Sequence, residues 1–488
     1  MPLNFDQSLV QFLLASWYLL VMTRRRVLVA LLLSLSVISA PSFVAPVQAA
    51  NVEDCRIKAS DWQQLSLGFP IRPERLAKLS SPRILVVPFQ LQDTPDYTFS
   101  SDLKQNYEIA ASYINDFSNG KSKPQFIFSP VIKTEITQSD IRDLRSNQNI
   151  GNQKRDESIS TWGFVRSFIT KYDVNLDFTG VDAVILEGSS PGTGIGEAMT
   201  YIRNYDPYWR PLKTNEGEVL NAVLMDGHWG SATIAHEVMH LYGLTDLYGS
   251  NTGPGRLSLM ASNSLNLLSY EKWVLGWLPD SEVTCVSNLS ASSITDFSFD
   301  YSKFDQLAVL RAPNEDPYIV ETTRSGGSKY IAFYSLNIEG RPPITLHEER
   351  GRVQSEGKDI GDYRSIGLQL KSPSFTLLIT NIEGNKISMS LAPTSQIDSA
   401  KFKDLISRAD QIRSQIELEA QNKAAAELKA MQDAEAKAAA KAKAAADKLA
   451  VSKAAAQKKV TITCVKGKTI KKITAVSPKC PTGFKRKR

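Results

Sequence analysis

The side chains best placed to do chemistry lie in one short segment that contains His236, Glu237 and His240. Residues four apart on an α-helix share a face, so the two imidazoles could bind one metal ion. Neutral imidazole is a common ligand of zinc, and two such ligands leave room for others. Glu237 would lie beside this face, where its carboxylate could accept a proton from a water molecule. The spacing therefore predicts a helical metal site with a general base.

The residues that follow predict how a third ligand could reach the metal. Gly243 can end the helix in the left-handed conformation, which glycine adopts without strain. The chain then turns back, so Asp246 can bring a carboxylate oxygen to the third ligand position. We expect the helix to span about 231–243, with its other, apolar side packed on a sheet.

Apolar runs along the rest of the chain predict the framework around this helix. Strands are expected at 83–89, 182–187 and 219–225, and helices at 102–117, 161–172 and 265–276. From 283 to about 393, short β runs separated by turn residues predict a β-rich module. The chain is therefore expected to have an α+β fold. The composition is globular, and a mean hydropathy of -0.21 excludes a polytopic membrane protein.

The C-terminal part of the chain has a different composition. Residues 402–458 are rich in Ala, Lys, Glu and Gln and contain no Gly or Pro, which predicts a helix of roughly 85 Å. It is interpreted as a solvated spacer, with a coiled coil possible only at its start. A hairpin across 461–465 and 470–476 is expected to follow.

The positive charge of the chain is concentrated in its tail. The whole chain carries a net charge of +6, yet residues 453–488 contain twelve Lys and Arg and no Asp or Glu, so the rest is acidic. The tail could attach the protein to an anionic cell-envelope polymer or act as a solubilising appendage. Phe484 is the one aromatic residue among these charges, which argues against nucleic-acid binding by base stacking.

The N-terminus has the pattern of a secretory signal peptide. Three arginines at 24–26 precede an apolar run at 27–40, and small residues at 47 and 49 mark a cleavage site after Ala49. A membrane anchor is the alternative, although the run is short for a span. Met22 could be the true start. We therefore expect a secreted protein, with retention at the cell surface if the tail attaches it.

Export favours disulfide bonds among the four cysteines. Cys464 and Cys480 lie 16 residues apart in one small segment and are expected to pair. Cys55 and Cys285 would then pair by elimination. The alternative is that Cys55 is a thiolate that covers the metal in a latent form.

The segment at 236–248, HEVMHLYGLTDLY, resembles the motif HExxHxxGxPDxY of the secreted zinc metallopeptidases of the immune inhibitor A family, which belongs with the metzincins. Four later segments also resemble that family, and together the similarity covers about residues 80–392. They are the Met-turn-like 257–261, the K-x-x-x-G-W-L segment within 270–279, and the β segments 318–321 and 331–335.

The resemblance implies a role for several residues. His236, His240 and Asp246 would be zinc ligands, Glu237 the general base and Met260 the apolar floor beneath the metal. Tyr270 and His228 are candidates for stabilising the oxyanion. Calcium is common in such secreted enzymes and is a second candidate cofactor, although the sequence contains no calcium-loop signature.

These observations predict a metzincin-like zinc peptidase domain, with a mixed twisted sheet and an active-site helix, that acts on protein or peptide substrates. The alternative is a catalytically inactive, surface-tethered binding protein on the same fold. Neither is an integral membrane protein after signal cleavage. The expected domains are a signal peptide at 1–49, a catalytic domain at 50–282, a β-rich module at 283–395, a helical spacer at 396–459 and a disulfide-closed basic module at 460–488.

Overall fold

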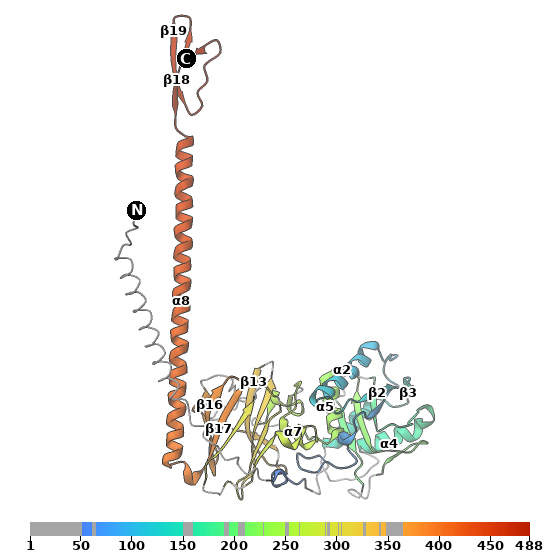
Figure 1. The fold of residues 1–488 in the computed structure, drawn as a ribbon. Coiled ribbons are helices and arrows are strands. Elements are labelled where there is room, and N and C mark those ends of the chain that lie inside the picture. The colour runs from blue at the N-terminus through green and yellow to red at the C-terminus, as the bar shows by residue number, and fades with distance from the viewer. Residues whose placement is uncertain are drawn as a thin grey trace, which may run out of the picture.

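The computed structural model describes most of the chain from residue 51 onward. The described segments are 51–60, 65–149, 160–189, 195–203, 210–227, 229–248, 253–262, 264–287, 289, 293–300, 302–303, 305–325, 328–340, 343–347 and 365–488. The expected signal peptide at 1–49 lies outside them. The chain has a mixed α+β fold with a long C-terminal helix, as predicted (Figure 1). No helix in these segments combines the length and apolarity that a bilayer crossing requires.

The first half of the described chain forms a six-stranded sheet in the order β2-β1-β4-β8-β5, with β3 also paired to β1. Its strands are parallel except for β5, which lies antiparallel to β8 at the edge. The strands are β1 (Arg83–Gln90), β2 (Gln125–Phe128), β3 (Ile132–Lys133), β4 (Ala183–Gly188), β5 (Gly196–Thr200) and β8 (Asn221–Asp226). A separate short hairpin pairs β6 (Leu212–Lys213) with β7 (Glu218–Val219).

Helices cover both faces of this sheet because its strands are apolar on both sides. In β1, Ile84 and Val86 face the core that contains α2 and α5, whereas Leu85 and Val87 face the core that contains α4. The helices are α2 (Ser101–Phe117), α3 (Gln138–Asn149), α4 (Thr161–Tyr172) and α5 (Ser231–Tyr242). The helix α5 that was predicted to carry the metal ligands is thus held on the sheet by its apolar side.

The second half forms two sheets that pack face to face around a shared apolar core that includes Leu310, Phe333 and Phe375. One sheet has the order β14-β13-β12-β11-β9 and the other β10-β17-β16-β15. The strands are β9 (Val283–Val286), β10 (Thr295–Asp300), β11 (Leu307–Leu310), β12 (Tyr318–Ser325), β13 (Ser328–Leu336), β14 (Ile344–Leu346), β15 (Gln369–Lys371), β16 (Phe375–Glu383) and β17 (Lys386–Pro393).

The two halves share a continuous core. The outer face of the five-stranded sheet, through Val309 and Ile319, belongs to the same apolar cluster as α2 and α5. The short helix α7 (Ser269–Val274) lies between the halves and contributes Trp273 to this cluster (Figure 1). The predicted border at residue 282 coincides with the start of β9, but packing continues across it.

Both expected disulfide bonds are formed. Cys55 pairs with Cys285 at an S–S distance of 2.06 Å and ties the N-terminal segment to β9. Arg56 adds an ion pair to Asp280 at 3.0 Å nearby. Because the Cys55 sulfur is bonded to Cys285, the alternative role of Cys55 as a thiolate over the metal is excluded.

The helix α8 (Ala400–Ala456) begins on the outer face of the four-stranded sheet. Its buried Phe402 packs against Leu378 and Ala392, and Arg413 donates a hydrogen bond to the backbone oxygen of Ile366 at 3.1 Å. Among the described residues, the start of α8 therefore packs against a sheet, where a coiled coil had been considered.

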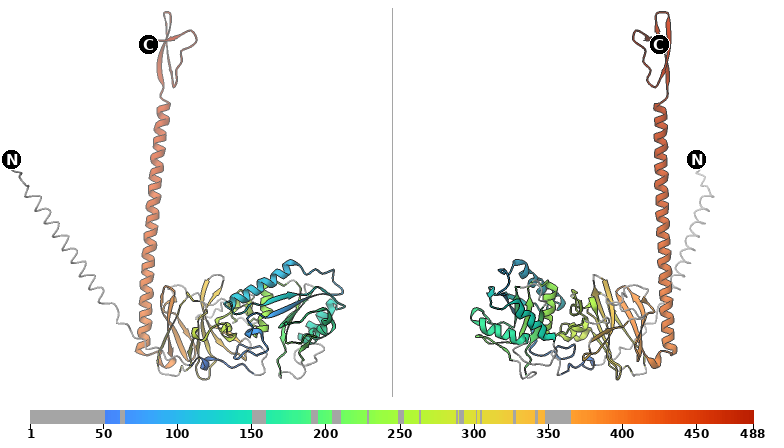
Figure 2. Two further views of the ribbon diagram at one scale, coloured as in Figure 1. Left: turned by 45° about the vertical axis from the view of Figure 1, so that its right-hand side comes forward. Right: turned by 180° about the vertical axis from the view of Figure 1, so that it is seen from behind.

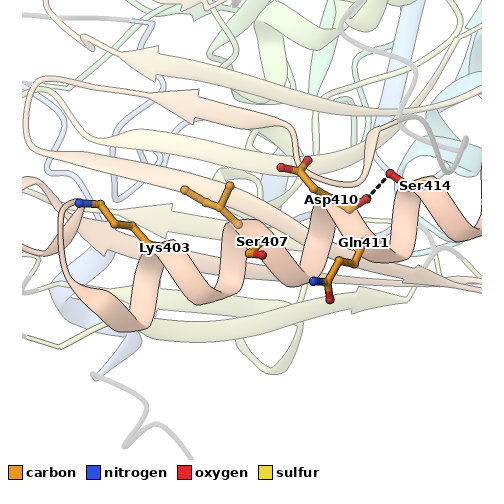
Figure 3. A pocket seen from close by; sticks show the side chains of 6 residues that line it. Lys403, Ser407, Asp410, Gln411 and Ser414 are labelled. Carbon is orange, nitrogen blue, oxygen red and sulfur yellow. Dashed lines mark hydrogen bonds between the residues drawn. The ribbon is translucent and has the colours of Figure 1, made fainter.

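An open hollow of about 560 Å³ lies along this part of α8. Figure 3 shows its lining, which comes from this one helix: Lys403, Ile406, Ser407, Asp410, Gln411 and Ser414. A hollow formed by one helix does not enclose a ligand, and this one lies far from α5 (Figure 1).

Beyond this docked part, α8 projects away from the body as a rod, as Figures 1 and 2 show. Residues 417–456 are all exposed and extend about 60 Å at 1.5 Å per residue. The rod ends in a small three-stranded sheet of β18 (Val460–Lys466), β19 (Thr469–Ala475) and β20 (Lys485–Arg486). This sheet is closed by the disulfide between Cys464 and Cys480.

Candidate metal centre

The helix α5 presents His236 and His240 at one end of the sheet. It ends at Gly243, whose φ of 119° is left-handed and whose N–H donates to the backbone oxygens of Met239 and His240. The buried side chain of Arg75 also donates to the His240 oxygen, at 3.0 Å. A Cβ at residue 243 would come within 3.0 Å of the end of the Ile71 side chain, which would have to shift, so the left-handed conformation is the main reason for glycine here.

The turn after Gly243 brings Asp246 back to both histidines. Its Oδ1 atom lies 3.2 Å from His236 Nε2 and 3.2 Å from His240 Nε2. These three ligand atoms lie within 4.8 Å of one another and form a group that could hold one metal ion. Both imidazoles are nearly buried, at 6% exposure each. The structure thus brings the three predicted ligands together.

The other ring nitrogens decide what this group can bind. His236 Nδ1 lies 3.0 Å from the backbone oxygen of Leu259, and His240 Nδ1 lies 2.8 Å from that of Leu244. A carbonyl oxygen only accepts, so each Nδ1 carries the hydrogen and each neutral ring turns the Nε2 lone pair toward Asp246. Three acceptors that face one another repel unless protons or a cation lie between them. The donor set therefore fits a metal ion, with the backbone contacts that commonly orient metal-binding histidines.

The electrostatics of the centre favour a charged Asp246. Burial acts to raise the pKa of Asp246. When protons rather than a metal lie between the three groups, the charged rings of His236 and His240 donate to Asp246 and outweigh burial, so this pKa lies well below its usual range. The side chain remains 40% exposed. Asp246 is thus an anionic ligand at the open side of the site.

Glu237 lies beside the ligands and is nearly buried, with 7% exposure. This burial raises its pKa above the usual value. Its carboxylate points at the edge strand β5, where a Cβ built on Gly196 would lie 2.8 Å from Glu237 Oε1. Gly196 therefore leaves the space that the predicted general base occupies, a role that the sequence analysis did not assign.

If Glu237 is the general base that the sequence predicts, Gly196→Ala should reduce catalytic turnover by about tenfold or more while leaving the fold and metal binding unchanged. The added methyl group must displace the free end of the Glu237 side chain, and a misplaced catalytic group can cost about 100-fold. Steady-state kinetics, thermal unfolding and zinc content check this. Unchanged turnover would show that the Glu237 carboxylate does not act from this position, and loss of zinc would show that Gly196 instead keeps the ligands in place.

The segment that contains Met260 supports two of the ligands from below. The Leu259 oxygen accepts from His236, and the Met260 oxygen accepts from the N–H of Leu247, beside Asp246, at 2.9 Å. Met260 is fully buried. Its own N–H donates to Ser258 Oγ at 3.0 Å. The predicted floor residue thus lies in the segment that contacts His236 and the turn that carries Asp246.

Two buried carboxyl groups extend the hydrogen-bond network from the Met260 segment to the β-rich half. Glu271 accepts from Ser258 Oγ at 2.8 Å, and Glu321 on β12 accepts from the N–H groups of Ser269 and Tyr270 at 3.0 Å each. Burial raises the pKa of Glu271 to about 7 and that of Glu321 to about 8. The sequence analysis missed both as site residues; for Glu321 the signal was an acidic residue within an apolar strand.

Tyr248 is a further residue of the centre that sequence reasoning did not assign. It lies two positions after Asp246, and its hydroxyl is hydrogen-bonded to the Asp246 carboxylate. Its ring stacks near His236, with centroids 6.0 Å apart, and is 59% exposed. Partial burial, the charge of Asp246 and a hydrogen bond to it raise the pKa of Tyr248 to about 12, so its hydroxyl is protonated and can donate.

Of the two predicted oxyanion candidates, the structure describes Tyr270, which lies in the core. Tyr270 is fully buried, its ring contacts Phe69 and Trp273, and no hydrogen bond from its hydroxyl is found in the described residues. His228 lies outside the described residues. The position of Tyr270 suits a role in the core beneath the site.

Comparison of the chain with protein-family models and with curated proteins finds no match.

Proposed function

We propose that this protein is a secreted zinc endopeptidase that hydrolyses internal peptide bonds of proteins or peptides. One observation carries the proposal: the Nε2 atoms of His236 and His240 and an oxygen of Asp246 converge, while Glu237 lies next to them. Acceptor atoms arranged in this way suit zinc with an open position for substrate. The two disulfide bonds are compatible with an extracellular location.

We also propose that the first half is a metzincin-like catalytic unit. Four features support this: the mixed sheet with an antiparallel edge strand, the helix α5, the glycine turn that leads to Asp246, and the buried Met260 next to Leu259, whose oxygen contacts His236. The resemblance of the sequence to the immune inhibitor A family is the other support for this proposal. A calcium site remains a proposal without a supporting cluster in the described residues.

The residues of the centre divide the chemistry between them. His236, His240 and Asp246 would hold zinc, which polarises a carbonyl and lowers the pKa of water. Glu237 accepts a proton from the attacking water and transfers it to the nitrogen of the leaving amine. Its nearly buried position excludes bulk water from the carboxylate, which strengthens this base.

The edge strand β5 is the natural position for an extended substrate. It pairs on one side with β8, and its other side has no strand partner among the described strands. An extended peptide can add to such an edge through main-chain hydrogen bonds. Because Gly196 begins this strand and contacts Glu237, a peptide bound there would pass beside the base.

Tyr248→Phe is expected to lower kcat by about 10- to 100-fold with little change in zinc content. The tyrosine hydroxyl is proposed to donate to the oxyanion that forms on the scissile carbonyl, and removal of such a donor costs about 100- to 1,000-fold in known cases. Because Tyr248 is 59% exposed, water can partly replace its hydroxyl, and we expect a loss below that range. Kinetics of peptide cleavage with zinc analysis tests this, and a loss confined to KM would reject the oxyanion role.

Cleavage of a peptide library by the purified protein tests the function itself. We expect cuts at internal bonds, identified by mass spectrometry, and one zinc ion per chain. Stoichiometric zinc without any cut over hours would favour the alternative, a catalytically inactive binding protein tethered to the cell surface.

A further inference from the structure

The module at the tip of the rod has a charge distribution that the proposed function does not use. Residues 460–488 contain nine Lys and Arg and no Asp or Glu, and the last acidic residue of the chain is Asp447. No ion pair is found in this module, all of which is described. These positive charges have no carboxylate side chain nearby to neutralise them.

The two faces of the small sheet differ. One face carries Ile462 and Cys464, which are buried, and the disulfide to Cys480 lies on this side. Lys471 is also on this face, opposite Cys464, and its ammonium lies 5.3 Å from the ring of Phe484. This covered face is the minimal core of the module, and it contains its one aromatic ring.

The other face is uncovered and presents a regular set of side chains. Directly opposite residues on paired strands point to the same side of a sheet. Thr463 lies opposite Lys472 on β19, and its oxygen accepts from the N–H of Lys487, which continues β20. Val465 lies opposite both Ile470 and Lys485. All three lysines are exposed.

These lysines form a compact cationic surface. Lys472 and Lys487 flank Thr463, so their backbones lie about 10 Å apart, and Lys485 is two residues along the same strand from Lys487, about 7 Å away. Like charges at these distances repel, and no acidic neighbour offsets the repulsion. An anionic ligand that spans the three ammonium groups would remove it, and the Thr463 hydroxyl can add a hydrogen bond.

The rod keeps this surface away from the acidic body. The exposed part of α8 spans about 60 Å, several times the Debye length of about 8 Å at physiological salt. The module therefore does not fold back onto the negative charge of its own chain, as Figures 1 and 2 illustrate. Its charge remains available to a partner in solution or on a surface.

We propose that the uncovered face, with Lys472, Lys485 and Lys487, binds a linear polymer of phosphate groups that carries no bases. Lysine suits this partner because its ammonium is a hydrated point charge that pairs with single phosphate oxygens. The face has no aromatic side chain for stacking bases, which disfavours single-stranded nucleic acid. Its apolar residues are limited to Val465 and Ile470, too few to insert into a bilayer.

The binding test uses the full chain with inorganic polyphosphate as the probe. The triple variant Lys472→Gln, Lys485→Gln and Lys487→Gln should bind about 10- to 100-fold more weakly at 0.1 M salt, and the slope of log K against log salt should fall by about 2–3. The matched control removes the same charge from the rod, with Lys437→Gln, Lys441→Gln and Lys443→Gln, and should stay within about threefold of the parent.

Three outcomes would overturn the proposal. Equal weakening by both triple variants would show that net charge, not this face, binds the polymer. Tighter binding of single-stranded DNA with the same number of phosphates would assign the face to nucleic acid. Binding to vesicles with anionic lipid but not to polyphosphate would assign it to a membrane. Circular dichroism and an intact Cys464–Cys480 bond establish that the variants are folded.

Discussion

Glu237→Gln is expected to lower peptide hydrolysis by about 10²- to 10⁴-fold while the protein keeps its fold and its zinc. The amide has nearly the shape of the carboxylate, but it cannot accept the proton of the attacking water or return it to the leaving amine. Glu237 is not one of the three converging ligands, so its replacement leaves the metal centre intact.

The readouts separate catalysis from stability. Rates are measured on one library peptide for the parent and the variant, with zinc content and thermal unfolding measured on the same preparations. Equal rates would remove Glu237 from the mechanism. A variant that has lost zinc or unfolded would show that the residue is structural, and Glu237→Asp then tests whether a carboxylate at a shifted position recovers activity.

Loss of a metal ligand is the second large effect. His240→Ala removes one of two imidazoles that face Asp246 and is expected to weaken zinc binding by more than about 100-fold, beyond the 10–100-fold typical of residues that only orient ligands. Activity should fall in parallel, because the proposed hydrolysis requires the metal. Zinc affinity is measured by competition with a chromophoric chelator.

His347→Ala is the matched control for this substitution. His347 is half-buried in the β-rich half, where its Nε2 lies 2.8 Å from Ser335 Oγ, and it takes no part in the ligand group. The control should bind zinc as the parent does. If both histidine variants keep full zinc affinity, the metal does not bind between His236, His240 and Asp246.

The ligand helix could be predicted because its signal is local. Two histidines one helical turn apart and a glycine three residues after the second fix both the face and the end of the helix. The structure has α5 at Ser231–Tyr242 and the left-handed residue at Gly243, within one residue of the expectation. The long helix α8 was predictable for a similar reason. Residues 402–458 contain no Gly or Pro that would break a helix, and α8 spans Ala400–Ala456.

The supporting contacts could not be predicted, because they join residues far apart in the chain. Arg75 donates to the last turn of α5, 165 residues away in the chain. Glu321 on β12 accepts from the N–H of Ser269 at the start of α7. The helix expected at 265–276 is in fact only Ser269–Val274, because Leu268 before it is extended. The apolar residues on either side of α7, such as Leu267 and Trp277, are buried by tertiary packing, so their burial does not require them to be helical.

The dependence of hydrolysis on zinc tests the central claim most directly. The purified chain is stripped with a zinc chelator and zinc is returned in steps, with peptide cleavage measured at each step. We predict no cleavage by the metal-free chain and a linear recovery that ends at one zinc per chain. Cleavage that persists without metal, or a fully loaded chain that cuts no peptide, would contradict the account.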